Sequence, residues 1–116
     1  MAEKIKVTDR VPTERWVEYF DKFSDGYHGR TVSLTVLDPS LGDEELIRQE
    51  PLQGIVYDPV GKGDDMVIET GQDTVEYRHI VRAPREVWVA RDTAGAVIAM
   101  RIDASDGSAT LVGLAP

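Results

Sequence analysis

The chain has 116 residues with 21 acidic and 13 basic side chains, so its formal net charge at pH 7 is −8 and it should repel nucleic-acid backbones. It has no Cys, which excludes disulfides, thiolate metal ligands and thiol nucleophiles and fits a reducing compartment. Since no stretch approaches the about 20 consecutive apolar residues of a membrane span, we expect a cytoplasmic protein without membrane contact.

Residues 1–12 are expected to form an N-terminal arm with a short strand at residues 5–7. The first ten residues carry charges in place of the apolar segment of a signal peptide, which supports the cytoplasmic expectation. The length fits one domain over residues 1–116, because no internal repeat or linker divides the sequence.

A helix is predicted over residues 13–24, where apolar side chains recur at helical spacing. Trp16, Phe20 and Phe23 fall at i, i+4 and i+7, so their rings share one face. Charged residues cover the opposite face. Three large rings on one face indicate that this helix plugs the open side of a curved sheet.

Two residues are expected to set the ends of this helix. Thr13 is the predicted N-cap, because its hydroxyl can accept a hydrogen bond from the N–H groups of the first turn. Gly26 is predicted to end the helix, because glycine readily adopts the left-handed conformation that closes one.

After residue 30 the chain alternates between apolar and polar side chains, which predicts strands. Val32, Leu34 and Val36 give the clearest alternation, and Asp106 with Gly107 gives the strongest hairpin signal. The predicted strands are residues 31–37, 45–49 (an edge strand or an irregular segment), 54–57, 66–70, 75–82, 86–91, 97–103 and 110–114.

Short connections join these predicted strands. Such connections cannot form the crossovers of parallel strands, so consecutive strands should pair antiparallel. We therefore predict an α+β fold in which one N-terminal amphipathic helix packs on a curled, mainly antiparallel meander of seven or eight strands over residues 31–114, as a roll or half-open barrel. Within it, Pro84 should stop a strand and hold Ala83 in an extended conformation.

Several packing and turn residues together are typical of one bacterial family. They are the aromatic helix, the sequence PLQGIVYD at residues 51–58, the strand with His79 and Ile80 that precedes Pro84, and the closing Asp-Gly hairpin. With these features the chain resembles domain-of-unknown-function family 5335 over residues 13–114. The resemblance implies a small single-domain bacterial protein and brings no activity, substrate, cofactor or catalytic residue.

His79 is the candidate for acid–base chemistry. Alternation places Tyr77, His79 and Val81 on one face of their strand. The imidazole could act as an acid or base beside Tyr77 or an Asp of a neighbouring strand. We favour a neutral histidine that is hydrogen-bonded where the strand meets a loop, because the sequence specifies no catalytic partner. We therefore predict no catalytic residue.

No metal site or cofactor is expected. His28 and His79 form neither an HxH nor an HExxH motif. Loop carboxylates such as those of Asp64 and Asp65 could bind calcium, but solvated turns are the more frequent role of such residues. The sequence GKG at residues 61–63 is too short for a phosphate-binding loop.

The charged residues are segregated along the chain. Residues 38–76 carry eleven acidic and two basic side chains, a net charge of −9, whereas residues 77–101 carry five Arg and two acidic side chains, a net charge of +3. Arg82 and Arg85 are therefore candidates for a binding surface. Alternatively, these arginines pair with the acidic segment of the sheet.

Trp88 is the aromatic candidate for the same surface, since Trp and Arg are enriched where interfaces concentrate their energy. If Val87 and Val89 face the core, Trp88 is exposed or covered by a partner. Alternatively, the sheet is buried on both faces and Trp88 is a core residue. The candidate binding residues are His79, Arg82, Arg85 and Trp88.

Three functions remain open. The favoured hypothesis is a non-enzymatic interaction or adaptor module that binds a protein partner or a second copy of itself. The second is a small-ligand-binding roll with a pocket between helix and sheet, lined by Trp16, Phe20, Tyr57 and His79. The third is a hydrolase or isomerase that uses His79 with a carboxylate.

Overall fold

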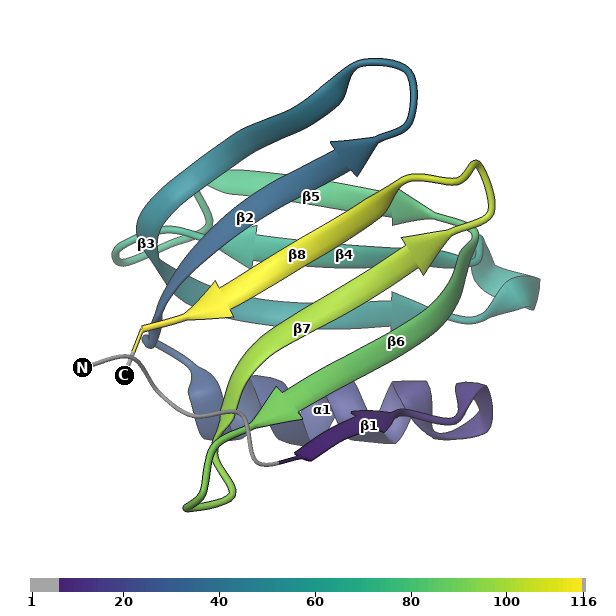
Figure 1. The fold of residues 1–116 in the computed structure, drawn as a ribbon. Coiled ribbons are helices and arrows are strands. Elements are labelled where there is room, and N and C mark those ends of the chain that lie inside the picture. The colour runs from purple at the N-terminus through teal and green to yellow at the C-terminus, as the bar shows by residue number, and fades with distance from the viewer. Residues whose placement is uncertain (1–6, 116) are drawn as a thin grey trace.

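The computed structural model describes residues 7–115 and contains one α-helix and eight strands (Figure 1). The helix α1 spans Trp16–Tyr27 and follows a 3-10 turn at Thr13–Arg15; a second 3-10 turn spans Val60–Lys62. The strands are β1 (Val7–Arg10), β2 (Thr31–Asp38), β3 (Gly42–Asp58), β4 (Asp65–Thr70), β5 (Tyr77–Arg82), β6 (Pro84–Arg91), β7 (Val97–Ala104) and β8 (Ala109–Leu114). Of the strand predicted at residues 5–7, residues 5 and 6 lie outside the described residues.

The strands form one unclosed antiparallel sheet in the order β1-β6-β7-β8-β2-β3-β4-β5. Strands β2 to β5 form one meander and β6 to β8 a second, and the pairing of β8 with β2 joins the two. The predicted α+β fold with a curled antiparallel sheet is therefore confirmed, but β5 and β6 do not pair, so the expectation that all consecutive strands pair is wrong at this point. The sequence had not indicated that the last strand returns to pair with β2.

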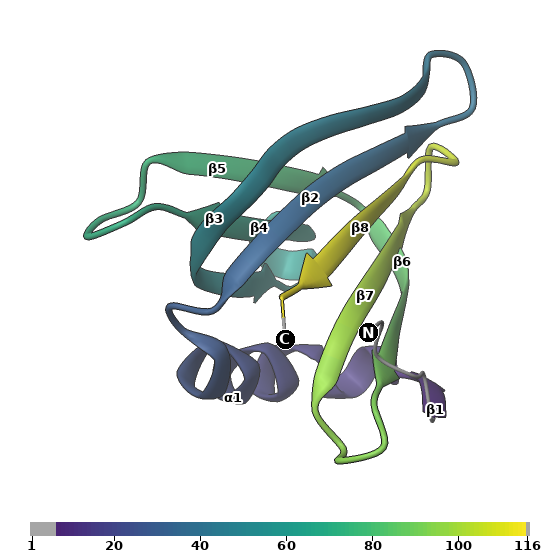
Figure 2. The same cartoon turned by 60° about the vertical axis from the view of Figure 1, so that its left-hand side comes forward.

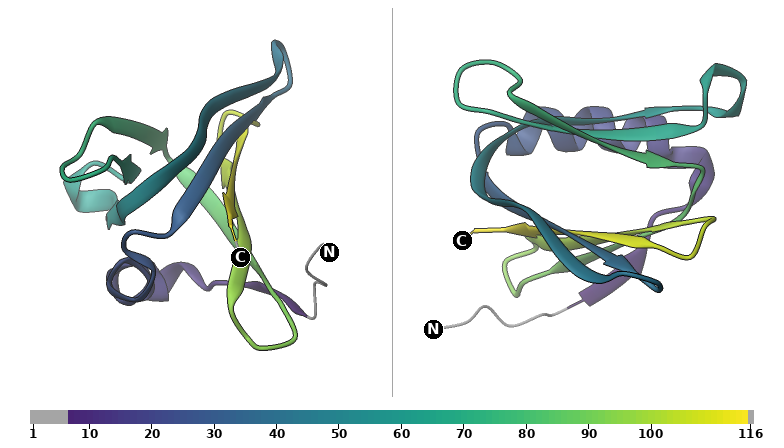
Figure 3. Two further views of the ribbon diagram at one scale, coloured as in Figure 1. Left: turned by 90° about the vertical axis from the view of Figure 1, so that its left-hand side faces the viewer. Right: turned by 90° about the horizontal axis from the view of Figure 1, so that it is seen from above.

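Curvature folds the sheet into two layers (Figures 2 and 3). The front layer contains β1, β6, β7, β8, β2 and residues 42–50 of β3, and the back layer contains residues 52–58 of β3 with β4 and β5. Helix α1 lies along the side where the layers diverge and packs against β3. Among the described residues, no helix is both long enough and apolar enough to cross a membrane.

Strand β3 runs through both layers. Residues 42–50 pair only with β2, so the predicted edge strand is present, but it continues without a break into the strand predicted at residues 54–57. Gln49, at a φ of 55°, adopts a left-handed conformation close to where β3 passes from one layer to the other. One strand therefore replaces the two that were predicted.

Both expected ends of the helix are wrong. Thr13 lies inside the 3-10 turn, and no side chain caps either that turn or α1. The helix also continues past Gly26 to Tyr27, and Gly29, at a φ of 85°, adopts the left-handed conformation instead. Tyr27 is retained in the helix because its ring stacks on Phe23, with 4.4 Å between ring centroids.

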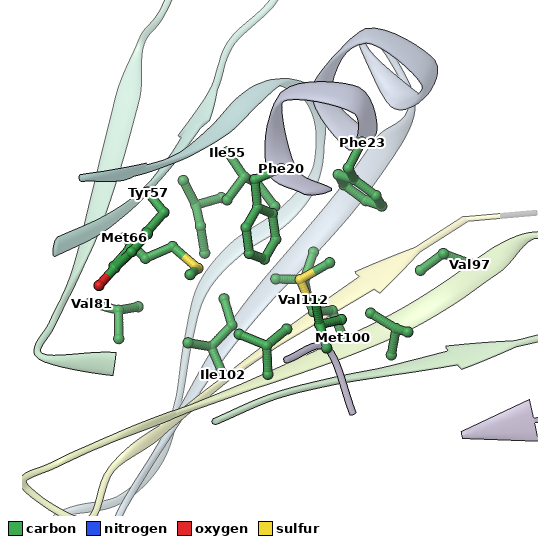
Figure 4. Packing of buried hydrophobic residues seen from close by; sticks show 14 of the residues in the cluster. Phe20, Phe23, Ile55, Tyr57, Met66, Val81, Val97, Met100, Ile102 and Val112 are labelled. Atoms are coloured by element: carbon green, nitrogen blue, oxygen red, sulfur yellow. The ribbon is translucent and has the colours of Figure 1, made fainter. Parts of the chain in front are cut away.

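The aromatic face of α1 fills the space between the two layers, as predicted (Figure 4). Trp16, Phe20 and Phe23 are 1%, 0% and 4% exposed. The Trp16 indole meets the ring of Tyr57 edge to face at 5.0 Å, and its Nε1 donates a hydrogen bond of 2.9 Å to the carbonyl oxygen of Val11. The buried polar atom of the indole is thereby satisfied.

A serine fixes the helix to β3. Ser24 Oγ donates to the carbonyl oxygen of Ile55 and accepts from its N–H, both at 2.9 Å. A Cβ at Gly54 would lie 3.4 Å from the hydroxyl oxygen of Ser24. This distance is an ordinary van der Waals contact, so the approach of helix and strand does not by itself require the glycine in the sequence PLQGIVYD.

The corner between β5 and β6 differs from the expectation. Ala83 has a φ of 48°, which is left-handed and not extended, and Pro84 begins β6. Two backbone hydrogen bonds hold the corner, from Ala83 N–H to the Asp64 carbonyl at 2.9 Å and from Ser105 N–H to the Ala83 carbonyl at 3.0 Å. These tertiary bonds stabilise a conformation that the local sequence disfavours.

Replacing Phe20 by Ala should lower the free energy of unfolding by about 3–5 kcal/mol, because it removes a fully buried ring from the centre of the core. The control is Val17→Ala, at a position that is 45% exposed on the same helix, which should change stability by only about 0.5 kcal/mol. Urea unfolding measures both. Similar losses in the two variants would contradict the packing described above.

Candidate functional site

The structure separates the four predicted binding residues. His79 and Arg82 line a small pocket where β5 faces the hairpin between β7 and β8. Trp88 lines a larger hollow on the outer face of the front layer. Arg85 is exposed and lines neither cavity. The four residues therefore do not form one site.

The small cavity, which we name the polar pocket, has a volume of about 190 Å³. Its polar lining residues come from β5 and from the β7–β8 hairpin with the start of β8, and they are His79, Arg82, Asp106, Ser108 and Thr110. Apolar side chains complete the lining. The pocket thus contains an imidazole, a guanidinium, a carboxylate and two hydroxyl groups.

His79 joins the two layers across this pocket. The predicted alternation of β5 is confirmed, with Tyr77, His79 and Val81 less exposed than their neighbours. His79 Nε2 lies 3.0 Å from Oγ1 of Thr110 on β8, so imidazole and hydroxyl share a hydrogen bond. Burial lowers the pKa of His79 below its ordinary value, so the imidazole is neutral at pH 7. The hydrogen bond agrees with the interpretation that we favoured, but His79 lies within β5 and bonds to β8, not where the strand meets a loop.

The carboxylate of the pocket is already engaged by its own turn. Asp106 Oδ1 accepts hydrogen bonds from Ser108 Oγ at 2.6 Å and from Ser108 N–H at 2.9 Å. The hydroxyl bond, followed by the backbone bond, lowers the pKa of Asp106 and keeps it charged. Within residues 7–115, no group of three or more His, Asp or Glu is placed to hold a metal ion.

Most arginines of the sheet have acidic partners. Arg78 pairs with Glu69 at 2.8 Å, and the guanidinium of Arg82 lies 3.8 Å from Asp65. These two pairs agree with the alternative in which arginines bond the acidic segment 38–76. Arg82 is exposed and its ion pair is long, so the pair adds little stability.

The second hypothesis placed a ligand pocket between helix and sheet, but three of its four lining residues pack against one another and the core there. Trp16, Phe20 and Tyr57 are all at least 93% buried and belong to the core cluster. Tyr57 Oη donates a hydrogen bond of 2.8 Å to Asp64 Oδ1. Burial, followed by this bond, raises the pKa of Tyr57 to about 12. These residues therefore support the fold and line no ligand site.

The larger cavity is a hollow of about 620 Å³ on the outer face of the front layer, the face turned to the reader in Figure 1. Strand register places small side chains in one row across five strands, which forms the floor. The floor residues are Thr8 on β1, Ala90 on β6, Ala99 on β7, Gly113 on β8 and Ser33 on β2. We name this cavity the outer trough.

A second row of side chains forms one wall of the outer trough. Trp88 lies opposite Arg101, Arg101 opposite Leu111 and Leu111 opposite Thr35. Trp88 is half-buried, and its Nε1 donates to Glu86 Oε1 at 3.1 Å. Since Val87 and Val89 are buried in the core, the prediction that Trp88 then points away from it is confirmed.

Sequence reasoning missed the floor of the outer trough. Ala90, Ala99 and Gly113 each alternate with buried residues of their own strands, so the outward direction of each could have been inferred. Their alignment in one row depends on the register of β6, β7, β8 and β2, which the sequence does not specify.

Substitution of His79 by Gln should reduce the pH dependence of stability. Because the pKa of His79 is lowered in the folded state, its stabilising effect is present above the unfolded pKa of about 6.5 and is lost as the pH falls below that value. Wild type should therefore lose more stability between pH 7.5 and pH 5 than the variant does. At pH 7.5 the variant should be less stable by about 1 kcal/mol, through the lost hydrogen bond.

Urea unfolding at the two pH values provides the measurement. Thr110→Val is the matched variant, because it removes the hydroxyl partner but keeps the buried imidazole. It should retain most of the wild-type pH dependence. If His79→Gln also retains the wild-type pH dependence of stability, burial of the His79 imidazole is not the source of that dependence.

Comparison with known proteins complements this geometry. The chain is similar to an uncharacterized protein of Aquifex aeolicus (strain VF5), with 28% identity over 109 residues that cover 94% of this chain and 93% of the relative. No solved structure matches the chain. The model of a family of unknown function, DUF5335, matches residues 7–116, which include α1 and all eight described strands. The resemblance inferred from the sequence is thus confirmed, and the chain belongs to this family.

Proposed function

We propose that this protein is a cytoplasmic, non-enzymatic interaction module that binds a protein partner in the outer trough. The observation that carries the proposal is the hollow itself: about 620 Å³ on a sheet face, with a floor of small side chains and Trp88 in its wall. Proteins place Trp beside well-shaped depressions where binding energy is concentrated. No described element of the chain covers this face (Figure 3).

The contents of the polar pocket support a binding role over catalysis. His79 has a hydroxyl within hydrogen-bond distance, but Thr110 is 4% exposed, so a substrate has little access to that oxygen. Asp106 is bonded to Ser108, and within residues 7–115 no hydrogen bond or ion pair joins its carboxylate to the imidazole. Enzymes that hydrolyse their substrates by covalent catalysis usually have a nucleophile, a base bonded to it and a third group that orients the base. The side chains of the polar pocket do not form such a set.

The proposal predicts that Trp88→Ala and Gly113→Leu abolish partner binding. Trp88→Ala removes the aromatic wall, and Gly113→Leu fills the floor, where a Cβ would meet no atom within 4 Å. The matched controls are Ile80→Ala, at an exposed position on β5, and Gly26→Leu, at an exposed position on α1 that also has open space. If Trp88 is a binding hot spot, its truncation should weaken the affinity for the partner at least about 30-fold.

Light scattering measures self-association, and affinity capture from cells that encode this chain measures binding of other proteins. Circular dichroism verifies that each variant is folded. Partner capture or self-association should disappear in both trough variants and persist in both controls. A monomeric protein that captures the same partners with Trp88→Ala and Gly113→Leu as with wild type would refute the proposal.

A second candidate function is the binding of a small ligand in the same trough. Its volume lies within the range of about 300–1,000 Å³ that is usual for small-molecule pockets. In that case a metabolite library should contain a compound that raises the melting temperature of wild type and not of Gly113→Leu. A compound that stabilises both proteins equally would bind elsewhere and would contradict this candidate.

A further inference from the structure

We propose that the partner segment in the outer trough is an amphipathic α-helix of about 13 residues that carries an acidic side chain opposite Arg10. This inference rests on the proposed function and specifies the chemistry of its partner. It follows from the length and direction of the trough, from the hydrogen-bonding needs of a peptide on a sheet face, and from a cation beside Trp88 that has no partner among the described residues.

The dimensions of the floor set the length of the segment. The row from Thr8 to Ser33 crosses five adjacent strands, which is four interstrand spacings of about 4.8 Å, or about 19 Å. An α-helix rises about 1.5 Å per residue, so about 13 residues span this distance. Because Ala90, Ala99 and Gly113 are small, the large side chains of a helix can reach the sheet backbone between them.

The direction of the trough selects a helix over an extended peptide. The floor lies on the face of the sheet, where the backbone N–H and C=O groups of β6, β7, β8 and β2 already bond to neighbouring strands. An extended segment on this face would find no backbone partners and would bury unsatisfied polar groups, at a cost of about 1–3 kcal/mol each. A helix satisfies its own backbone and presents only side chains.

The single charge of Arg10 places one acidic side chain on the partner. Arg10 lies opposite Trp88 in the pairing of β1 with β6. Arg101, on the other side of Trp88, bonds to Asp103 at 2.8 Å, and the indole itself bonds to Glu86. Within the part of the chain that the structure describes, no hydrogen bond or ion pair involves the Arg10 side chain, and an apolar partner that covered it would leave this charge uncompensated. A carboxylate on the bound helix would compensate it.

Peptide display on the intact protein tests this inference. The probe is a library of random 14-residue peptides, selected on wild type and counter-selected on Gly113→Leu, which retains the fold but has a filled floor. Selected sequences should carry large apolar residues at i, i+3 or i+4, and i+7, with Asp or Glu near one end. As synthetic peptides they should become helical on binding, and they should perturb the NMR signals of Ala99, Leu111 and Gly113.

A charge exchange tests the role of Arg10. Arg10→Glu should weaken the selected acidic peptides at least about tenfold and should favour versions in which Lys replaces the acid. Arg85→Glu is the matched control, since Arg85 is exposed but, unlike Arg10, does not lie opposite Trp88 in the sheet, and it should leave affinity unchanged. If Arg10→Glu alters folding, Arg10→Gln, which should also weaken binding, replaces it.

The outcomes separate this inference from the proposed function. The inference is overturned if the selected peptides bind as extended chains, or if Arg10→Glu leaves their affinity unchanged. This holds even if partner capture still depends on Trp88 and Gly113. A library that yields no peptide sensitive to Gly113→Leu would also overturn it. The proposed function fails separately, when the natural partners bind the trough variants as well as wild type.

Discussion

The packing of one aromatic helix face between two layers of a bent sheet is the constraint on which this structure depends. Phe20 and Trp16 fill the interior from the helix side, and Ser24 fixes α1 to β3 by two hydrogen bonds. The inner faces of both layers are thereby covered by the chain itself. Among residues 7–115 no element covers the outer face of the front layer in this way, and this is the face on which we place the proposed binding surface.

Features that depend on local periodicity could be predicted from the sequence, and features that depend on distant contacts could not. Trp16, Phe20 and Phe23 recur at helical spacing, so the helix and its buried face were evident. The conformation of Ala83 is different, because bonds to Asp64 and Ser105 override the preference of a residue that precedes proline. The same reasoning explains why the pairing of β2 with β8 was missed.

The candidate site was predictable to the same extent. Alternation around Val87 and Val89 was sufficient to direct Trp88 outward, and alternation in β5 was sufficient to direct His79 inward. Neither pattern could show that β5 faces the β7–β8 hairpin, which gives His79 its Thr110 partner and places Arg82 in the same pocket. The grouping of the four candidates into one surface was therefore an assumption, and tertiary structure separates them.

The floor of the outer trough is unfavourable for a sheet that has no partner. Alanine and glycine are depleted in strands, because they add little side-chain packing across the sheet, and glycine also loses more backbone entropy on folding. Yet Ala90, Ala99 and Gly113 lie side by side on three neighbouring strands. Larger β-branched residues at these outward positions would stabilise the isolated sheet, and the open space around Gly113 shows that one could be accommodated there. A depression made of residues that weaken the sheet is not explained by the stability of the fold, and it supports the partner binding that we propose.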